Sequence, residues 1–524
     1  MDPNRDEVRA HGRGGVSVPR TGVPSIPRKL PSVEVAASGT GDEPLAALVS
    51  KEAVDSAGRT GEEQLAAAEH RRPAELMARL GAKGSAGEIR RVDEPAPRAR
   101  WLVGTGENSG ADYREAGAAL IRAVQADAEA CAGSGDEAPE VVRVALPPDM
   151  EPDAVDDLVY GIALGGYRYR VGSANQEAPV RGVRLVVPEG RQESAYRVAV
   201  ARASELAAAT ALARDLANTP SNVKNPAWLA RVARDLADDR VGLDVRVRDE
   251  GWLAEHGFGG ILAVGGGSAS APRLIELSYD PGGGCAHVLL VGKGITFDTG
   301  GLSIKPADGM HLMRTDMSGG AAVLAAMRAI ANLGIATRVT ALVPAAENHV
   351  SGAAYRPGDV VRHYGGRTSE ITNTDAEGRI VLADALAYGT ERAAPDAVVD
   401  VATLTGAMKV SLGVRTGGVF ATEPTLAERV CAAGQRVGEA WWTMPLLDDH
   451  AESVVSDIAD VRQAPQGPGG VTAALFLREF AGDLPWAHLD IAGPARAESN
   501  YREVVPGGTG FAARTLVELV ASYA

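Results

Sequence analysis

Short runs of continuously apolar residues alternate along this chain with amphipathic stretches of helical length, and this alternation constrains the fold more than any other feature. One run is HVLLV at 287–291, and others lie within TRVTALVPA, DAVVDVATL and WAHLDIAG. Stretches such as SGGAAVLAAMRAIANLG separate the runs and have the apolar spacing of helices. Strands that are apolar on both faces and separated by helices are typical of a mostly parallel sheet covered on both sides. We therefore predict an α/β fold.

The domain organisation follows from where these patterns begin and end in a chain of 524 residues, which is long enough for more than one domain. Residues 1–42 have few periodic apolar positions, so we predict a flexible leader that is dispensable for activity. Residues 43–190 mix strand-like runs with Ala-rich helices and predict a small N-terminal α/β domain. A long helical pattern at 191–220 predicts a linker helix, and residues 221–524 predict a larger α/β domain with the mostly parallel central sheet.

The charge balance argues against several classes of partner. Lys and Arg total 53 against 68 Asp and Glu, a net charge of -15, and an acidic surface repels both phosphate backbones and anionic lipids. We therefore do not expect nucleic acid as a general partner. No apolar run reaches the ~18 residues of a membrane-spanning helix, and the N-terminus lacks the apolar core of a secretory signal. With three cysteines and no CxxC spacing, these features predict a cytoplasmic protein.

Charged residues follow the apolar run HVLLV closely. VGKGITFDTGGLSIKP at 291–306 contains Lys293, Asp298 and Lys305 among glycines and hydroxyl groups. Ligands of α/β sheets gather at the carboxyl ends of strands, which is where these residues would lie. We therefore predict a functional site at this edge of the sheet.

Two further segments bring acidic residues to the start of a helix. MRTDMSGGAAV contains Asp316, and NTDAEGR at 373–379 contains Asp375 and Glu377. Together with Asp298, these carboxylates would repel one another in one cavity, and two divalent cations about 3.5–4 Å apart would balance their charge. Each residue also has an ordinary structural interpretation, such as a helix N-terminus for Asp316 or an Asx turn for Asp375. The residues alone leave both interpretations open.

Other hydrolytic and nucleotide-binding motifs are missing from the sequence. No two of the nine histidines are four residues apart, which excludes an HExxH zinc site. No GxSxG motif occurs, and GKG at 292–294 lacks the remainder of a Walker loop. Serine hydrolases of that type and P-loop nucleotidases are therefore excluded.

The three charged segments, in this order and spacing, closely resemble the motifs of the leucyl aminopeptidase family, also called cytosol aminopeptidases. NTDAEGR is the signature of that family. Stretches such as NTPSNVKNPAWLA, ENHVSGAAYRPGDVV and VDVATLTGA extend the resemblance over nearly all of residues 200–524, which would form the catalytic domain. The first 190 residues resemble the family only in outline.

The resemblance implies a two-metal peptidase and a role for each matching residue. Lys293 and Asp316 would bind one metal, Asp375 the other, and Asp298 and Glu377 would lie between the two. The two catalytic positions match Lys305 and Arg379, and the substrate-binding positions match Met313, Asn373, Thr403, Leu404 and Gly406. In the family, the lysine stabilises the developing oxyanion and the arginine holds a bicarbonate that shuttles protons.

The same resemblance implies an aminopeptidase that releases N-terminal leucine and other apolar residues from peptides with a free N-terminus. It implies two divalent metal ions per subunit, with Mn2+, Zn2+ and Mg2+ as candidates, and a homohexamer. Two alternatives stay open. One is another two-metal hydrolase, such as a phosphoesterase. The other is an additional DNA-binding regulatory role, suggested by six basic residues within the first thirty.

Overall fold

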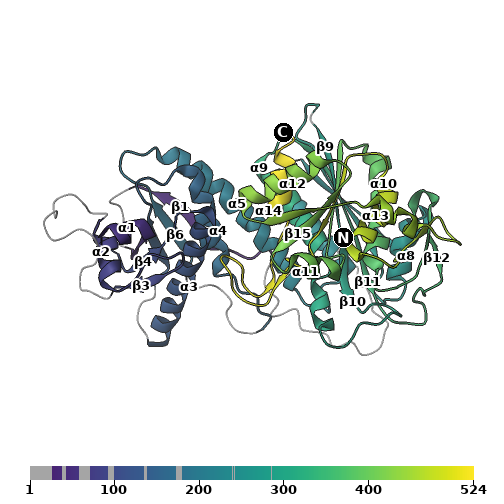
Figure 1. Ribbon diagram of the computed structural model, residues 1–524, viewed down its shortest axis with the longest axis horizontal. Coiled ribbons are helices and arrows are strands. Elements are labelled where there is room, and N and C mark those ends of the chain that lie inside the picture. Colours follow the sequence, from purple (N-terminus) through teal and green to yellow (C-terminus); the bar gives the residue numbers. More distant parts are fainter. Residues whose placement is uncertain are drawn as a thin grey trace, which may run out of the picture.

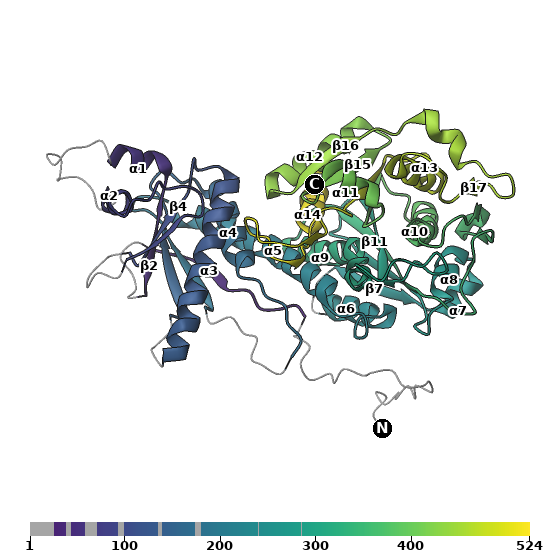
Figure 2. The same ribbon diagram turned by 60° about the horizontal axis from the view of Figure 1, so that its bottom comes forward.

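The structure is a computed structural model that describes residues 26–37, 43–57, 71–92, 99–134, 139–172, 180–238, 240, 242–284 and 286–524. Two sheets, each covered by helices, lie on either side of the long helix α5 (Glu193–Asn218), as Figures 1 and 2 show. The helix packs against α4 (Val155–Gly165) of the first part and α9 (Ser318–Leu333) of the second. It falls within the range 191–220 in which the sequence predicts a linker helix. No helix of the described residues is long and apolar enough to cross a membrane.

The N-terminal part contains a six-stranded sheet in which only the β3–β4 pair is antiparallel. Its strands, in spatial order, are β1 (Ser32–Ala36), β6 (Gly182–Val186), β5 (Val141–Ala145), β2 (Leu45–Val49), β4 (Trp101–Gly104) and β3 (Ile89–Arg91). Helices cover both faces. Ala46 packs with α3 (Gly110–Ser134) and α4 on one side, and Ala47 packs with α1 (Lys51–Ala57) and α2 (Arg71–Arg79) on the other. Consecutive residues of a strand point to opposite faces, so the small side chains of β2 let helices approach from both sides.

The predicted flexible leader of residues 1–42 is wrong for residues 26–37. Ser32–Ala36 form β1, which pairs along its whole length with Gly182–Val186 at the edge of the sheet. Val35 is buried, and the backbone N–H of Arg28 donates to Asp215 Oδ2 at 2.9 Å. The alternating pattern SVEVA is a short strand signal whose partner lies far away in the sequence, which is why local periodicity did not reveal it. The remaining residues of the predicted leader lie outside the described residues.

We therefore expect removal of β1 to destabilise the N-terminal sheet, in contrast to the dispensable leader that the sequence predicted. Deleting residues 1–36 should lower the thermal unfolding midpoint by several degrees more than deleting residues 1–25, because only the longer deletion removes the ladder between β1 and β6. Differential scanning calorimetry of the two variants measures this difference. Equal midpoints would show that β1 contributes nothing to stability.

The C-terminal part is built on a nine-stranded sheet with a parallel centre. In spatial order its strands are β16 (Ala440–Met444), β15 (Thr416–Ala421), β18 (Trp486–Asp490), β14 (Ala397–Ala402), β9 (His287–Gly292), β11 (Arg338–Asn348), β8 (Arg273–Tyr279) and β7 (Leu243–Arg248), and β10 (Gly294–Asp298) also pairs with β11. The central strands β18, β14, β9 and β11 are parallel to their neighbours within this group. The prediction of an α/β fold with a mostly parallel central sheet is confirmed.

Helices bury both faces of this sheet. One face packs against α6 (Pro226–Ala237), α9 and α12 (Pro424–Val437), with α14 (Ala513–Ala521) packed on α9 and α12. The other face packs against α8 (Gly259–Gly265), α10 (Glu377–Ala393) and α13 (Gly469–Ala481). In β9, Val288 and Leu290 belong to the first core, whereas Leu289 and Val291 belong to the second. Burial on both faces favours apolar side chains at consecutive positions, which explains the run VLLV at 288–291.

The remaining elements are short. In the N-terminal part, η1 (Pro152–Ala154) directly precedes α4. The remaining helices of the C-terminal part are α7 (Glu250–Glu255), α11 (Gly406–Leu412), η2 (Met310–Thr315), η3 (Tyr364–Gly366) and η4 (Asp448–Val454). The remaining strands form a sheet of β12 (Val360–Arg362), β13 (Thr368–Glu370) and β17 (Val461–Arg462), and a pair of β19 (Arg496–Ala497) and β20 (Gly507–Gly508).

Candidate metal centre

Six charged residues meet at the carboxyl edge of β9 and β10. Lys293 directly follows β9, Asp298 ends β10, and Lys305 lies in the loop after β10. The others stand at the beginnings of helices: Asp316 just before α9, Asp375 just before α10, and Glu377 as the first residue of α10. The central strands are parallel, so their carboxyl ends and the following helix N-termini share one edge of the sheet.

The carboxylates are close enough to share cations. Asp298, Asp375 and Glu377 each have one carboxylate oxygen within 4.8 Å of such an oxygen of the other two. Asp316 joins this group through Lys293, whose Nζ lies 2.9 Å from Asp316 Oδ1 and 2.8 Å from Glu377 Oε1. The sequence predicted that these acidic segments would converge, and the structure brings all four carboxylates into one cluster.

Lys305 lies on the other side of the cluster. Its Nζ lies 2.8 Å from Asp298 Oδ2 and also forms an ion pair with Asp375. The Lys305 side chain is 20% exposed, whereas that of Lys293 is 4% exposed. The two lysines are therefore not equivalent: one is enclosed between carboxylates, and the other can be reached from solvent.

Neighbouring groups hold the carboxylates in fixed orientations. Asp298 Oδ1 accepts hydrogen bonds from Asn348 Nδ2 at 2.8 Å and from the backbone N–H of Gly300 at 2.7 Å. The hydroxyl of Thr403 donates to Asp316 Oδ1 at 2.8 Å. Sequence reasoning missed Asn348, although it lies in ENHVSGAAYRPGDVV, one of the stretches that carried the resemblance.

Glycines allow the close approach of backbone that this arrangement requires. A Cβ on Gly319 would lie 2.0 Å from the carbonyl oxygen of Val401, so only glycine lets the start of α9 sit against the end of β14. A Cβ on Gly378 would lie 2.6 Å from Lys293 Cε. The glycines of SGG and EGR therefore bring both helix starts against the charged cluster.

The residues of the cluster fit divalent cations. Four carboxylates face two ammonium groups, which leaves an excess of negative charge in a buried place. Glu377 Oε2 and Asp316 Oδ2 are buried and have no hydrogen-bond partner among the described residues. A buried carboxylate oxygen without a partner is costly, and coordination of a hard cation is a common way to satisfy it.

Burial and mutual repulsion raise the pKa values of three acids of the cluster. Burial raises the pKa of Glu377 to about 8, the charge of Asp298 adds to this effect, and Lys293 opposes it. Burial also raises the pKa of Asp316 and of Asp375, against the nearby lysines. The protein groups alone thus shift the pKa values of these acids upward, and bound cations would shift them downward and favour the ionised forms.

Burial and the neighbouring charges act on the pKa of Lys293 in opposite directions. Burial acts to lower its pKa, but Asp316, Glu377 and Asp298 outweigh burial, and the pKa of Lys293 is raised. A lysine can bind a metal only through a neutral amine, because an ammonium group has no lone pair. The lowered pKa that a ligand role requires must therefore come from cations held by the same carboxylates.

Arg379 is buried on the first turn of α10. Its Nη1 donates to the carbonyl of Gln463 at 2.8 Å, while its Nε has no partner among the described residues. Burial lowers the pKa of Arg379 to about 10, although Glu377 and Asp490 act against this. Arg379 therefore remains a cation with donors to spare for a planar anion.

Gln463 also positions one predicted substrate residue. Its Nε2 donates to the carbonyl of Asn373 at 2.8 Å, and its Oε1 accepts from the backbone N–H of Asn373 at 3.0 Å. Asn373 is exposed, and its own Oδ1 accepts from the N–H of Asp375. Gln463 lies in an irregular segment after β17, and no local signal in the sequence pointed to it.

The other predicted substrate residues lie on two segments beside the cluster. Thr403 and Leu404 follow β14, and the Leu404 N–H donates to Asp490 Oδ1 at 3.2 Å. Gly406 is the exposed first residue of α11. Met313 lies on η2, and its carbonyl accepts from the N–H of Asp316 at 3.2 Å. Their roles toward a substrate stay predictions.

Comparison with sequence families and curated proteins points to one family. The family model described as "Cytosol aminopeptidase family, catalytic domain" matches residues 211–517. The "Probable cytosol aminopeptidase" of Streptomyces avermitilis is 43% identical over 503 residues, which cover 93% of this chain and 94% of that protein. The protein of the same name in Corynebacterium diphtheriae is 40% identical over 457 residues, covering 86% of this chain and 88% of that protein.

Two solved structures have the same architecture over almost the whole chain. "Bottromycin maturation enzyme BotP in complex with Mn" superimposes with a TM-score of 0.77 at 39% sequence identity and covers 92% of this chain and 99% of its own. A mutant of tomato leucine aminopeptidase superimposes with a TM-score of 0.82 at 27% identity, and the match covers 96% of this chain and 99% of that chain.

Proposed function

This chain belongs to the cytosol aminopeptidase family and is a metal-dependent aminopeptidase, and on this premise we propose that it releases leucine and other apolar residues from the N-termini of peptides by a two-metal mechanism. The observation that carries the proposal is the buried carboxylate cluster. Glu377 and Asp316 each have a buried oxygen without a hydrogen-bond partner among the described residues, at the edge of the sheet where two further carboxylates converge.

In this proposal the cluster divides between two cations. Lys293 and Asp316 would hold one, Asp375 would hold the other, and Asp298 and Glu377 would lie between them. The ion pairs of Lys293 with Asp316 and Glu377 support this division, since all three side chains already point to one place. Divalent cations would supply Lewis acidity, which lowers the pKa of water and polarises a peptide carbonyl.

Lys305 and Arg379 are the proposed catalytic residues of the chain itself. Lys305 is partly exposed and next to Asp298 and Asp375, so its ammonium group can stabilise negative charge that develops on the carbonyl oxygen of a substrate. Arg379 has a free Nε and a planar fork, which suit a bound bicarbonate that carries a proton. No histidine is hydrogen-bonded or ion-paired to the four carboxylates among the described residues, which supports an external proton carrier.

The substrate would enter with its free α-amine toward the cluster. Asn373, Thr403, Leu404 and Gly406 would border its backbone, and Met313 would line the pocket for the first side chain. The apolar character of Met313 and Leu404 supports a preference for leucine and similar residues. Peptides with a free N-terminus are then the partners of the site.

The metal identity, the assembly and the location are further parts of the proposal. The solved BotP structure contains Mn, which supports manganese, and zinc and magnesium are the other candidates. A homohexamer and a cytoplasmic location agree with the family. Most of the six basic residues within the first thirty, which suggested DNA binding, lie outside the described residues. Of those described, Arg28 contacts Asp215 through its backbone.

The function can be tested with three substrates. We expect hydrolysis of leucine amide in the presence of Mn2+ or Zn2+, and at least a hundredfold less hydrolysis of N-acetyl-leucine amide, because acetylation removes the free amine. p-Nitrophenyl phosphate should not be hydrolysed. Turnover is measured beside the content of bound metal, and a panel of amino-acid amides should rank leucine above charged residues.

Two outcomes would contradict the proposal. Equal hydrolysis of leucine amide and N-acetyl-leucine amide would show that the enzyme does not require a free N-terminal amine. Hydrolysis of the phosphate ester without hydrolysis of leucine amide would make the chain a phosphoesterase on the same cluster.

A further inference from the structure

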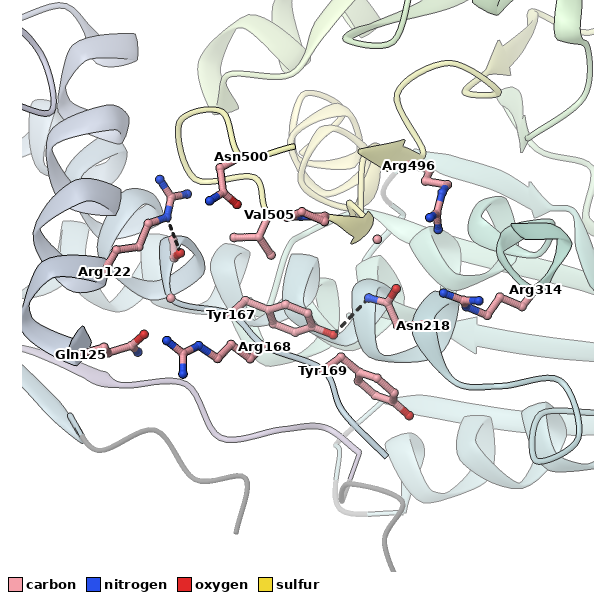
Figure 3. A pocket seen from close by; sticks show the side chains of 14 residues that line it. Arg122, Gln125, Tyr167, Arg168, Tyr169, Asn218, Arg314, Arg496, Asn500 and Val505 are labelled. Atoms are coloured by element: carbon pink, nitrogen blue, oxygen red, sulfur yellow. Dashed lines mark hydrogen bonds between the residues drawn. The ribbon is translucent and has the colours of Figure 1, made fainter. Parts of the chain in front are cut away.

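A cavity lies between the N-terminal part and the C-terminal part, and none of the four carboxylates of the metal centre lines it. Its volume is about 560 Å3. One end is lined by Arg122 of α3 and Arg168 of the segment after α4, and the other by Arg314 of η2 and Arg496 of β19 (Figure 3). Among the residues that line it there is no aspartate or glutamate. A wall with four arginines and no acid is unexpected in a chain of net charge -15.

Arg314 and Arg496 differ from the other two arginines because some of their donors have no partner. Within the described part of the chain, neither Arg314 nor Arg496 forms an ion pair. Arg496 Nε, Arg496 Nη1 and Arg314 Nε are shielded from solvent and have no hydrogen-bond partner there. Figure 3 shows both guanidinium groups directed toward the same space, with the amide of Asn218 beside them. Burial and the charge of Arg314 lower the pKa of Arg496, and the nearby Glu498 opposes this effect without outweighing it.

At the other end of the cavity, the arginine donors have partners. Arg168 forms an ion pair with Glu129, and Arg122 donates from Nε to the carbonyl of Gly165 at 2.9 Å and from Nη2 to the carbonyl of Arg502 at 2.6 Å. Arg314 Nη1 donates to the carbonyl of His311 at 3.2 Å, but the guanidinium donors without a partner are concentrated around Arg314 and Arg496. A guanidinium fork matches the oxygens of a phosphate group, and two forks on one side of a cavity suit a dianion.

We propose that this cavity binds a small molecule bearing a phosphate group, held by Arg314 and Arg496 with the amide of Asn218 beside them. The volume is within the range of small-molecule sites, about 300–1,000 Å3, and leaves room for the rest of a ligand besides its phosphate group. The ligand would touch both parts of the chain and would thereby stabilise their contact. This inference does not depend on the peptidase activity.

The site also adjoins the metal centre through η2. Arg314 lies two residues before Asp316, and its carbonyl accepts a hydrogen bond from the buried Lys224 Nζ at 2.6 Å. Lys224 additionally donates to the carbonyls of Leu216 and Ala217 at the end of α5. The segment that carries Met313 is thus fixed to the helix between the two parts, and a ligand held by Arg314 would add a second restraint on this segment.

The test uses the full-length protein with its metal content held constant, and inorganic phosphate, ribose 5-phosphate and ribose as probes. Isothermal titration calorimetry and thermal unfolding are compared for the wild type, Arg496→Gln and Arg246→Gln. Arg246 is exposed on β7 and provides a control that loses the same charge. Phosphate that binds to the metal centre contributes equally in all three proteins. Arg496→Lys keeps the charge but loses the fork.

We expect both phosphate-bearing probes to raise the unfolding midpoint of the wild type and of Arg246→Gln, and ribose to have no effect. Arg496→Gln should bind at least tenfold more weakly, with Arg496→Lys between the two. Without probe, Arg496→Gln should unfold at a higher temperature than the wild type, because it relieves the repulsion with Arg314. Tighter binding of ribose 5-phosphate would identify a phosphorylated small molecule as the ligand, and equal affinity would identify free phosphate. Absence of binding to the wild type, or equal affinity in Arg496→Gln, would overturn the site.

Discussion

Glu377→Ala and Asp375→Ala are each expected to lower the turnover of leucine amide below about 1% of the wild-type value. Each carboxylate is a proposed cation ligand, and every ~1.4 kcal/mol of lost transition-state stabilisation costs a factor of ten in rate. The fold should persist, because neither side chain belongs to the hydrophobic cores of the sheet. Steady-state turnover, bound metal per subunit and circular dichroism measure the three effects.

Glu370→Ala is the matched control for these two variants. Glu370 lies on β13, accepts a hydrogen bond from Ser456 at 2.6 Å and pairs with Arg462 at 3.2 Å, outside the carboxylate cluster. Its loss removes a partnered carboxylate but no proposed ligand, so activity should stay near the wild-type value. If Glu377→Ala or Asp375→Ala retained more than about a tenth of the activity with normal metal content, the ligand assignment would be wrong.

Lys293→Arg and Lys305→Arg are expected to differ in metal content. Arginine keeps its charge in proteins and offers no lone pair, so it cannot replace a lysine that binds a metal. The site of Lys293 also has no space for a guanidinium, because Gly378 packs so closely that even a Cβ there would lie 2.6 Å from Lys293 Cε. Lys293→Arg should therefore lose or weaken one metal and most of the activity.

Lys305→Arg should keep both metals, since a charged side chain is what the proposed role of Lys305 needs. Its partly exposed position leaves room for the larger group, and Asp298 and Asp375 can pair with either cation. Metal per subunit after dialysis, measured beside leucine-amide turnover, separates the variants. Two tightly held metals in Lys293→Arg, or a lost metal in Lys305→Arg, would contradict the two roles.

The sequence alone determined the fold class and the main charged residues of the site. Burial on both faces of a strand favours continuous apolar runs such as HVLLV. Such a run consists of neighbouring residues, so it can be recognised from the sequence without knowledge of the tertiary structure. Asp298, Asp316, Asp375 and Glu377 were candidates because each belongs to a short charged segment, and the resemblance to the aminopeptidase family assigned them to a metal site. Their position at strand and helix ends predicted the edge of the sheet at which they meet.

Only the tertiary structure decided which groups support those residues. Asn348 orients Asp298 from fifty positions away, and Gln463 meets Arg379 from eighty-four positions away. Such contacts depend on which strands are neighbours in the sheet, and single-chain periodicity carries no information about that pairing. The same reason explains why β1 was mistaken for part of a leader, since its partner β6 lies far along the chain. It also explains the arginine-lined cavity: Arg314 and Arg496 come from segments far apart in the sequence, and only the packing of the chain places both charges against one space.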